Sequence, residues 1–144
     1  MTDEIGSNYI ITTYSGPLLP LSYRNMIFSK WLKSLRHGND QLKLIDAKAY
    51  YAYHHLLIDD LLARPSTQVR IASAEDDKDV ALGFAVSRPD VFDYVYVNRD
   101  LRRNGIGSAL VIHAHAEFKF THITKTGLML AKLKRPHWKY NPYV

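Results

Sequence analysis

Residues 94–110 read YVYVNRDLRRNGIGSAL, which predicts a strand, a tight basic turn and the start of a helix. The aromatic and β-branched run at 94–97 is typical of a strand. The turn carries three arginines, and Gly105 and Gly107 stand where the helix begins. N–H groups at a helix N-terminus have no partner within the helix, and glycines let an anion approach the backbone closely. The stretch therefore predicts a site for a phosphate-bearing ligand.

Length and composition describe an ordinary globular domain. The 144 residues, 47% hydrophobic and 23% charged, suffice for one domain with a hydrophobic core. The absence of cysteine excludes disulfides and thiolate metal sites. The net charge of +5 favours anionic partners. The acidic start MTDE is unlike a signal peptide, and no segment has the apolar length to span a bilayer, so we expect a cytoplasmic protein without a membrane partner.

The remaining pattern predicts a mixed, mostly antiparallel sheet flanked by helices, which is the α+β class. A charged turn at 75–79 makes its two flanking strands an antiparallel hairpin, with Gly83 at a bulge. We expect a single domain over 1–144 that ends in a basic aromatic tail at 131–144. In chain order, the predicted elements are a strand at 9–14, helices at 23–35 and 46–63, strands at 69–74, 80–87 and 91–97, a helix from 106 to 118, and a strand within 123–130.

Two common phosphate-binding motifs fit the glycine turn poorly. A Walker A loop needs a Lys-Ser/Thr pair after its second glycine, whereas Gly107 is followed by Ser108 and Ala109. A dinucleotide-binding turn needs a third glycine at the position of Leu110 and a βαβ unit around it. The predicted antiparallel hairpin does not supply that unit.

Residues 102–107, RRNGIG, resemble the R-x-x-G-x-G/A motif of GNAT-type N-acetyltransferases. The resemblance extends back through 96–101 and forward through 108–110, although Arg99 stands where the family commonly has proline. The predicted order of elements, β-α-α-β-β-β-α-β, is also that of the family. Since the chain ends at Val144, we expect it to lack the family's usual last two strands.

This resemblance implies that the chain binds acetyl-CoA, or another acyl-coenzyme A. The pantetheine arm would pair with the fourth strand at Val95 and Val97, as an added strand does. The helix dipole and backbone N–H groups would attract the diphosphate. The residues implied to hold that diphosphate are Arg102, Arg103, Asn104, Gly105, Ile106, Gly107 and Ser108.

Acyl transfer to an amine needs a general base, a polarised thioester carbonyl and a general acid. A backbone N–H of the fourth strand can polarise the carbonyl. For the base we expect Asp93, which lies on that strand beside the expected reaction centre. Glu75 and Asp76, near the hairpin turn, are alternatives.

The general acid implied by the resemblance is a tyrosine. Tyr140 lies at about the family's separation from Gly107, and Tyr143 is an alternative. The setting of Tyr140 departs from the family's N-x-x-A-x-x-x-Y pattern, because Leu133 and Pro136 occupy the Asn and Ala positions.

These features predict an N-acetyltransferase that moves an acetyl group from acetyl-CoA to an amine, on a protein or a small molecule, by direct attack in a ternary complex. One alternative is a non-catalytic GNAT-like interaction or phage virion-associated protein. Another is nucleic-acid binding through the basic tail, which interleaves cations with aromatic rings. A homo-oligomer or a partner protein could complete the short sheet. His54–His55 and His113–His115 lack the spacing of a helical metal pair, so we expect no metal.

Overall fold

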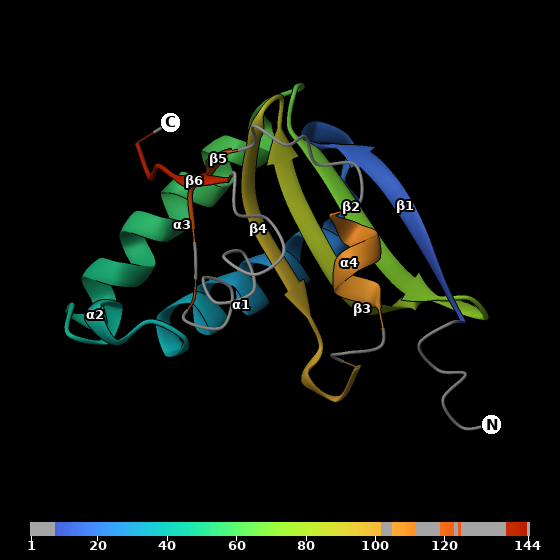
Figure 1. Cartoon of the computed structure of the whole chain (residues 1–144), viewed down its shortest axis with the longest axis horizontal. Coiled ribbons are helices and arrows are strands. Elements are labelled where there is room, and N and C mark those ends of the chain that lie inside the picture. The colour runs from blue at the N-terminus through green and yellow to red at the C-terminus, as the bar shows by residue number, and fades with distance from the viewer. Residues whose placement is uncertain (1–7, 102–104, 112–118, 123, 125–137, 144) are drawn as a thin grey trace.

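The computed structural model describes residues 8–101, 105–111, 119–122, 124 and 138–143. This part of the chain forms one six-stranded sheet with strand order β1-β2-β3-β4-β5-β6 (Figure 1). Neighbours from β1 to β4 are antiparallel, whereas β5 runs parallel to both β4 and β6. The sheet is therefore mixed, which confirms the predicted α+β class. The strands are β1 Tyr9–Ser15, β2 Gln68–Ala74, β3 Asp77–Arg88, β4 Val91–Val97, β5 Lys119–Phe120 and β6 Lys139–Tyr140.

Helices cover both faces of this sheet. Figure 1 shows α4 in front of the strands and α1 behind them. The helix α3 is preceded by the N-cap residue Asp46, whose carboxylate accepts the N–H of Ala49 at 3.1 Å. No helix within the described ranges is long and apolar enough to cross a membrane. The helices are α1 Leu21–His37, α2 Asp40–Lys43, α3 Ala47–Ala63 and α4 Ile106–Leu110, with 3₁₀ turns η2 Gly16–Leu18 and η3 Arg99–Leu101.

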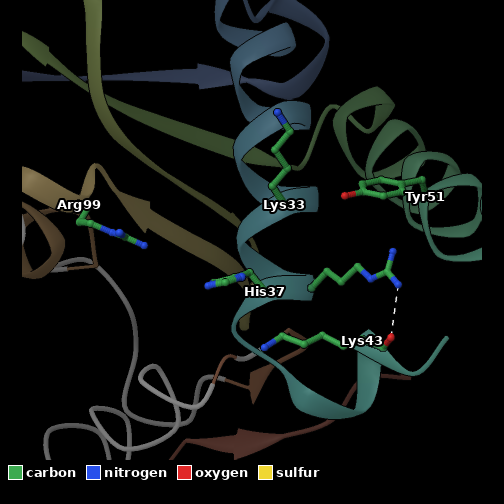
Figure 2. Close-up of a pocket in the computed structure, with 6 residues that line it drawn as sticks. Lys33, His37, Lys43, Tyr51 and Arg99 are labelled. Atoms are coloured by element: carbon green, nitrogen blue, oxygen red, sulfur yellow. Dashed lines mark hydrogen bonds between the residues drawn. The ribbon is translucent and has the colours of Figure 1, made fainter. Parts of the chain in front are cut away.

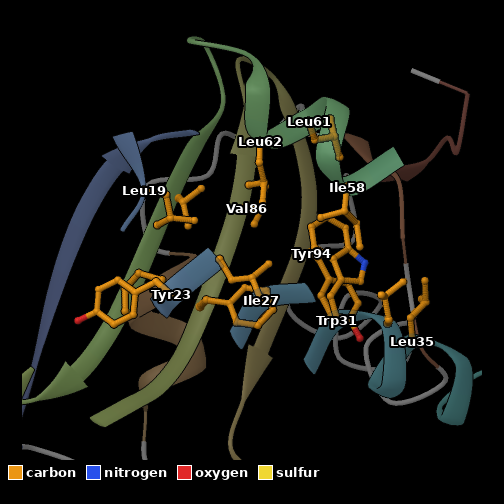
Figure 3. Packing of buried hydrophobic residues seen from close by; sticks show 14 of the residues in the cluster. Leu19, Tyr23, Ile27, Trp31, Leu35, Ile58, Leu61, Leu62, Val86 and Tyr94 are labelled. Atoms are coloured by element: carbon orange, nitrogen blue, oxygen red, sulfur yellow. The ribbon is translucent and has the colours of Figure 1, made fainter. Parts of the chain in front are cut away.

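The first core cluster lies between the sheet and the helices α1 and α3. Every fourth residue of α1, from Tyr23 through Ile27 and Trp31 to Leu35, is buried there. Figure 3 shows these side chains against residues of the sheet such as Val86. Burying each such side chain stabilises the fold by about 1.5–3 kcal/mol. This stripe fixes α1 across the strands.

The second core cluster fixes α4 on the opposite face. Ile106 and Leu110 are fully buried and pack in one cluster with Ala72, Leu82 and Val97 of the sheet. The two clusters therefore place α4 on one face of the sheet and α1 and α3 on the other. The edge of β4 lies between these two layers.

The observed order of elements agrees with the predicted order through α4, apart from the unpredicted short helix α2. Of the helix predicted over 106–118, residues 112–118 lie outside the described residues. The hairpin of β2 and β3 is antiparallel, and its register shifts just beyond Gly83, as the predicted bulge requires. The fifth strand lies at Lys119–Phe120, before the predicted range of 123–130, and of that range the structure describes only Thr124. The short strand β6 within the tail was not predicted.

Candidate functional site

The site begins where the pairing of β4 with β5 ends. Val91 pairs with Lys119 and Phe92 with Phe120, and the Thr121 N–H donates to the Phe92 carbonyl at 3.0 Å. Within the described residues this pairing goes no further, although β4 continues to Val97. The far end of β4 thus keeps β3 on one side and has no described strand on the other.

A bulge at Asp93 changes the direction of the backbone in β4. The register with β3 shifts between Val86 and Ser87, so that Asp93 is the extra residue. The bulge turns the backbone N–H and C=O groups of β4 that follow it relative to those that precede it. It also directs the Asp93 side chain into the protein, where it is fully buried.

Backbone groups at Val95 and Val97 face the side away from β3. The N–H of Asn98 donates to the Leu82 carbonyl of β3 at 2.9 Å. Because backbone polar groups alternate along a strand, those of Val97 and Val95 point to the opposite edge. The Val95 side chain is 38% exposed, whereas Val97 is buried beneath α4. Strand β4 therefore offers an edge at Val95 to an extended ligand.

The turn before α4 has the shape that its glycines predict. Gly105 has a φ of 84°, a left-handed conformation that favours glycine, and it caps the helix. Among the described residues, a Cβ at Gly107 would contact the Val97 side chain at 3.6 Å, an ordinary van der Waals distance. The first N–H groups of α4, including that of Ser108, have no partner within the helix. Arg102, Arg103 and Asn104 lie outside the described residues.

Asp93, the expected general base, is held in a buried ion pair. Arg88 donates to both carboxylate oxygens, from Nε at 3.0 Å and from Nη2 at 2.8 Å. The Thr121 hydroxyl donates to Oδ1 at 2.8 Å. A fully buried carboxylate with three donors is well suited to orient its neighbours. This position gives Asp93 the geometry of a positioning residue.

His122 completes a chain of hydrogen bonds from Asp93. Its Nδ1 lies 2.8 Å from the Thr121 hydroxyl oxygen. Since the single hydrogen of that hydroxyl goes to Asp93, Nδ1 must carry the proton and donate to Thr121. This assignment leaves the lone pair on Nε2, which is the form of imidazole that can accept a proton.

The surroundings of His122 keep its ring neutral. Burial lowers its pKa from 6.5 to about 4, against the opposing effect of Asp93. Trp31 of α1 meets the ring edge to face, with centroids 5.3 Å apart. His54 of α3 lies further off, at 6.2 Å, and burial lowers its pKa too. A neutral histidine therefore stands after β5, on the face of the sheet that carries α1 and α3.

Helix α1 spans the region between β4 and the segment after β5. Its Trp31 stacks on Tyr94 of β4 with centroids 5.0 Å apart, and the Ser34 and Tyr94 hydroxyls are 2.6 Å apart. At the end of α1, a Cβ on Gly38 would come within 2.8 Å of Thr124. The C-terminal half of α1 therefore lies beside both β4 and the segment after β5.

Tyr140 lies on β6, two strands from β4, and the alternative bases lie at the β2–β3 turn. The Tyr140 ring stacks on Phe120 with centroids 5.5 Å apart and is 54% exposed, whereas Tyr143 is 93% exposed. Glu75 and Asp76 form the β2–β3 turn, and the Glu75 N–H bonds to Asn8 before β1. That turn lies toward the opposite edge of the sheet from β5.

Sequence reasoning missed Thr121 and His122. Neither belongs to a recognisable motif, and they meet Asp93 only because β5 pairs with β4 near the bulge. The one signal available in the sequence was a histidine after a short β-rich segment.

The tail packs onto the core at Trp138, which lies near Phe92 and Phe120 in the second core cluster. The rest of its cationic run, 132–137, lies outside the described residues.

The chain is similar to proteins of one family and to several solved structures. Residues 33–130 match the model of the acetyltransferase (GNAT) family. A Pyrococcus furiosus protein described as an acetyl transferase is 15% identical, with 94% of this chain and 84% of that chain covered and a TM-score of 0.48. The aminoglycoside N-acetyltransferase AAC(6')-Iy in complex with CoA is 12% identical, covers 92% and 76%, and has a TM-score of 0.41.

A third solved structure, ribosomal-protein-alanine N-acetyltransferase from Brucella melitensis biovar Abortus 2308, is 15% identical. It covers 92% of this chain and 80% of its own, with a TM-score of 0.39. Among curated proteins, none is significantly similar to this chain. The family model nevertheless spans more than half of the chain, including the strand, turn and helix described above. The chain belongs to the acetyltransferase (GNAT) family.

Proposed function

We propose that this protein transfers an acetyl group from acetyl-CoA to an amine by direct attack in a ternary complex. The observation that carries the proposal is the meeting of two features at the end of the β4–β5 pairing. The edge of β4 at Val95 can receive an extended ligand, and the chain from Asp93 through Thr121 to His122 lies beside it. Family membership supports acetyl transfer in general.

The cofactor would lie along β4 with its diphosphate at the N-terminus of α4. Backbone groups at Val95, and at Val97 where they face the same edge, would bind the pantetheine arm as an added strand. The N–H groups of residues 106–108 would bind the diphosphate, and Gly105 sets the direction of that turn. From the family motif we extend this role to Arg102, Arg103 and Asn104.

The reaction would proceed with each proton accounted for. The amine nitrogen forms a bond to the thioester carbonyl carbon, and a β4 N–H stabilises the developing oxyanion. Nε2 of His122 accepts the proton that the nitrogen loses, while Asp93 and Thr121 hold the ring. The carbon–sulfur bond breaks, and the Tyr140 hydroxyl donates a proton to the departing thiolate. Acetyl-CoA supplies only the activated acyl group.

The test is release of free thiol from acetyl-CoA across a panel of primary amines. We expect His122→Gln to lower kcat by about 10²–10⁴-fold, because glutamine cannot accept the proton. Its acetyl-CoA affinity, measured by calorimetry, should match that of the wild type. His54→Gln is the matched control, since His54 borders the same cluster but bonds to its own helix at the Tyr50 carbonyl.

Two outcomes would contradict the proposal. Equal loss of activity in both histidine variants would remove the assigned role of His122. Binding of acetyl-CoA without thioester loss for any amine would contradict catalysis and favour the non-catalytic interaction protein.

A further inference from the structure

We propose that the acceptor amine carries an anionic group, a phosphate or a carboxylate, which binds an open basic pocket beside the site. The inference rests on the proposed acetyltransferase function. The basic pocket has a volume of about 500 Å³ (Figure 2). It lies among the ends of α1 and β4 and the helices α2 and α3, and its lining residues are Lys33, Arg36, His37, Lys43, Tyr51 and Arg99.

The lining is one-sided in charge. Among the residues that the structure describes, it contains four lysine or arginine side chains and a histidine, and no acidic residue. Lys43 has Asp40 at 3.6 Å, an exposed pair within α2 that neutralises little. In the described part of the chain, Lys33 and Arg99 have no ion pair. Cations gathered in a concave surface raise the local concentration of anions, so the pocket is built to attract negative charge.

The guanidinium of Arg36 lines the basic pocket in a fixed orientation. Its guanidinium donates to the backbone carbonyls of Lys43 at 3.4 Å and Ile45 at 2.9 Å. It also lies over the rings of Tyr50 and Tyr51, at 5.4 and 5.9 Å from their centroids. These partners are uncharged, so they orient the guanidinium without cancelling its charge. A preorganised cation of this kind favours an anion over water.

The pocket is lined by α1, α2 and α3 and by the segment after β4. Arg99 lies two residues after β4, whereas Lys33 and His37 project from α1 (Figure 2). The same helix carries Trp31, which contacts His122. The proposed diphosphate site belongs to α4, which packs on the opposite face of the sheet. An anion held in the basic pocket would therefore leave its amine on the face where His122 lies.

The test compares matched acceptors and two charge-reversal variants. O-Phosphoethanolamine is paired with ethanolamine, and glycyl-glutamate with glycyl-glutamine, so that a phosphate and a peptide carboxylate are tested separately. We expect a kcat/KM about tenfold or more higher for an anionic member, as charge-assisted hydrogen bonds provide. Lys33→Glu should abolish that preference by lowering kcat/KM for the anionic member of each pair. Lys30→Glu is the control, because Lys30 is exposed on the same helix outside the pocket.

Each contrary result has a distinct meaning. Equal use of both members of each pair by the wild type would overturn the inference while leaving the proposed function standing. If Lys33→Glu instead weakened acetyl-CoA binding, the pocket would serve the cofactor's phosphates and the inference would be wrong. If no amine were acetylated, the proposed function would fail, and calorimetry with O-phosphoethanolamine would still test the pocket. Binding lost in Lys33→Glu would support the pocket, and no binding to the wild type would overturn it.

Discussion

At the scale of single residues, the protonation of His122 links the site to the stability of the fold. Burial lowers its pKa to about 4, whereas an unfolded chain would protonate it near 6.5. Between these values the unfolded state binds more protons than the folded state. The contribution of neutral His122 to the free energy of unfolding is therefore complete above about pH 6.5 and is lost as the pH falls through about 4.

His122→Gln should remove this part of the acid sensitivity. Between pH 7 and pH 4 the wild type should lose about 1–3 kcal/mol more unfolding free energy than the variant, because only the wild type must protonate a buried imidazole. Urea unfolding at a series of pH values measures the difference. Parallel stability curves for the two proteins would show that the ring is not held neutral.

At the scale of elements, the ion pair of Arg88 and Asp93 joins the β3–β4 hairpin to β5. Asp93 is fully buried and also accepts the Thr121 hydroxyl, so removal of the guanidinium would leave a buried carboxylate without its charge partner. We expect Arg88→Met to lower the unfolding free energy by about 3–5 kcal/mol.

The control for that prediction is the pair of Arg64 and Asp60 on the surface of α3, with a nitrogen–oxygen distance of 2.6 Å. Both of its side chains are well exposed, so Arg64→Met should cost less than about 1 kcal/mol. Urea midpoints of the two variants make the comparison. Equal losses would mean that the buried pair contributes no more than an exposed one.

Elements with a strong internal period could be predicted from the sequence. The helices expected at 23–35 and 46–63 lie at Leu21–His37 and Ala47–Ala63, because an apolar stripe and terminal glycine or proline define each of them. The strands β5 and β6 have two residues each and carry no period. They exist through pairing with residues distant in sequence, so a local pattern could not locate them.

The turn before α4 and the hydrogen-bonded chain from Asp93 to His122 also differ in how far the sequence predicts them. The turn at Gly105 is contiguous in sequence, and its shape follows from local backbone geometry. The chain from Asp93 to His122 depends on a bulge in β4 and on its parallel pairing with β5. Neither feature can be read from residue types alone, which is why Asp93 was predicted without its partners.

At the scale of the whole molecule, the sheet separates the two proposed substrates. The α4 turn lies on one face, and the basic pocket with α1 and α3 lies on the other. The edge of β4 connects these faces beside His122. A ligand that follows this edge from α4 would bring its acyl group toward an acceptor on the other side, which is the arrangement that direct transfer needs.

The central claim is that the turn before α4 binds the diphosphate of acetyl-CoA. Gly107 tests it directly, because among the described residues a Cβ there meets Val97 at an ordinary contact distance. We therefore expect substitution to act on the ligand and not on the fold. Gly107→Glu would place bulk and negative charge where the diphosphate is expected. Gly107→Ala is the control, since the family motif accepts alanine at this position.

The decisive measurement is calorimetric titration of acetyl-CoA into the wild type and these two variants, with thermal unfolding recorded for each. We predict saturable binding to the wild type, binding retained in Gly107→Ala and binding abolished in Gly107→Glu, at closely similar unfolding temperatures. No binding to the wild type at millimolar acetyl-CoA, or unchanged binding to a folded Gly107→Glu protein, would contradict the account.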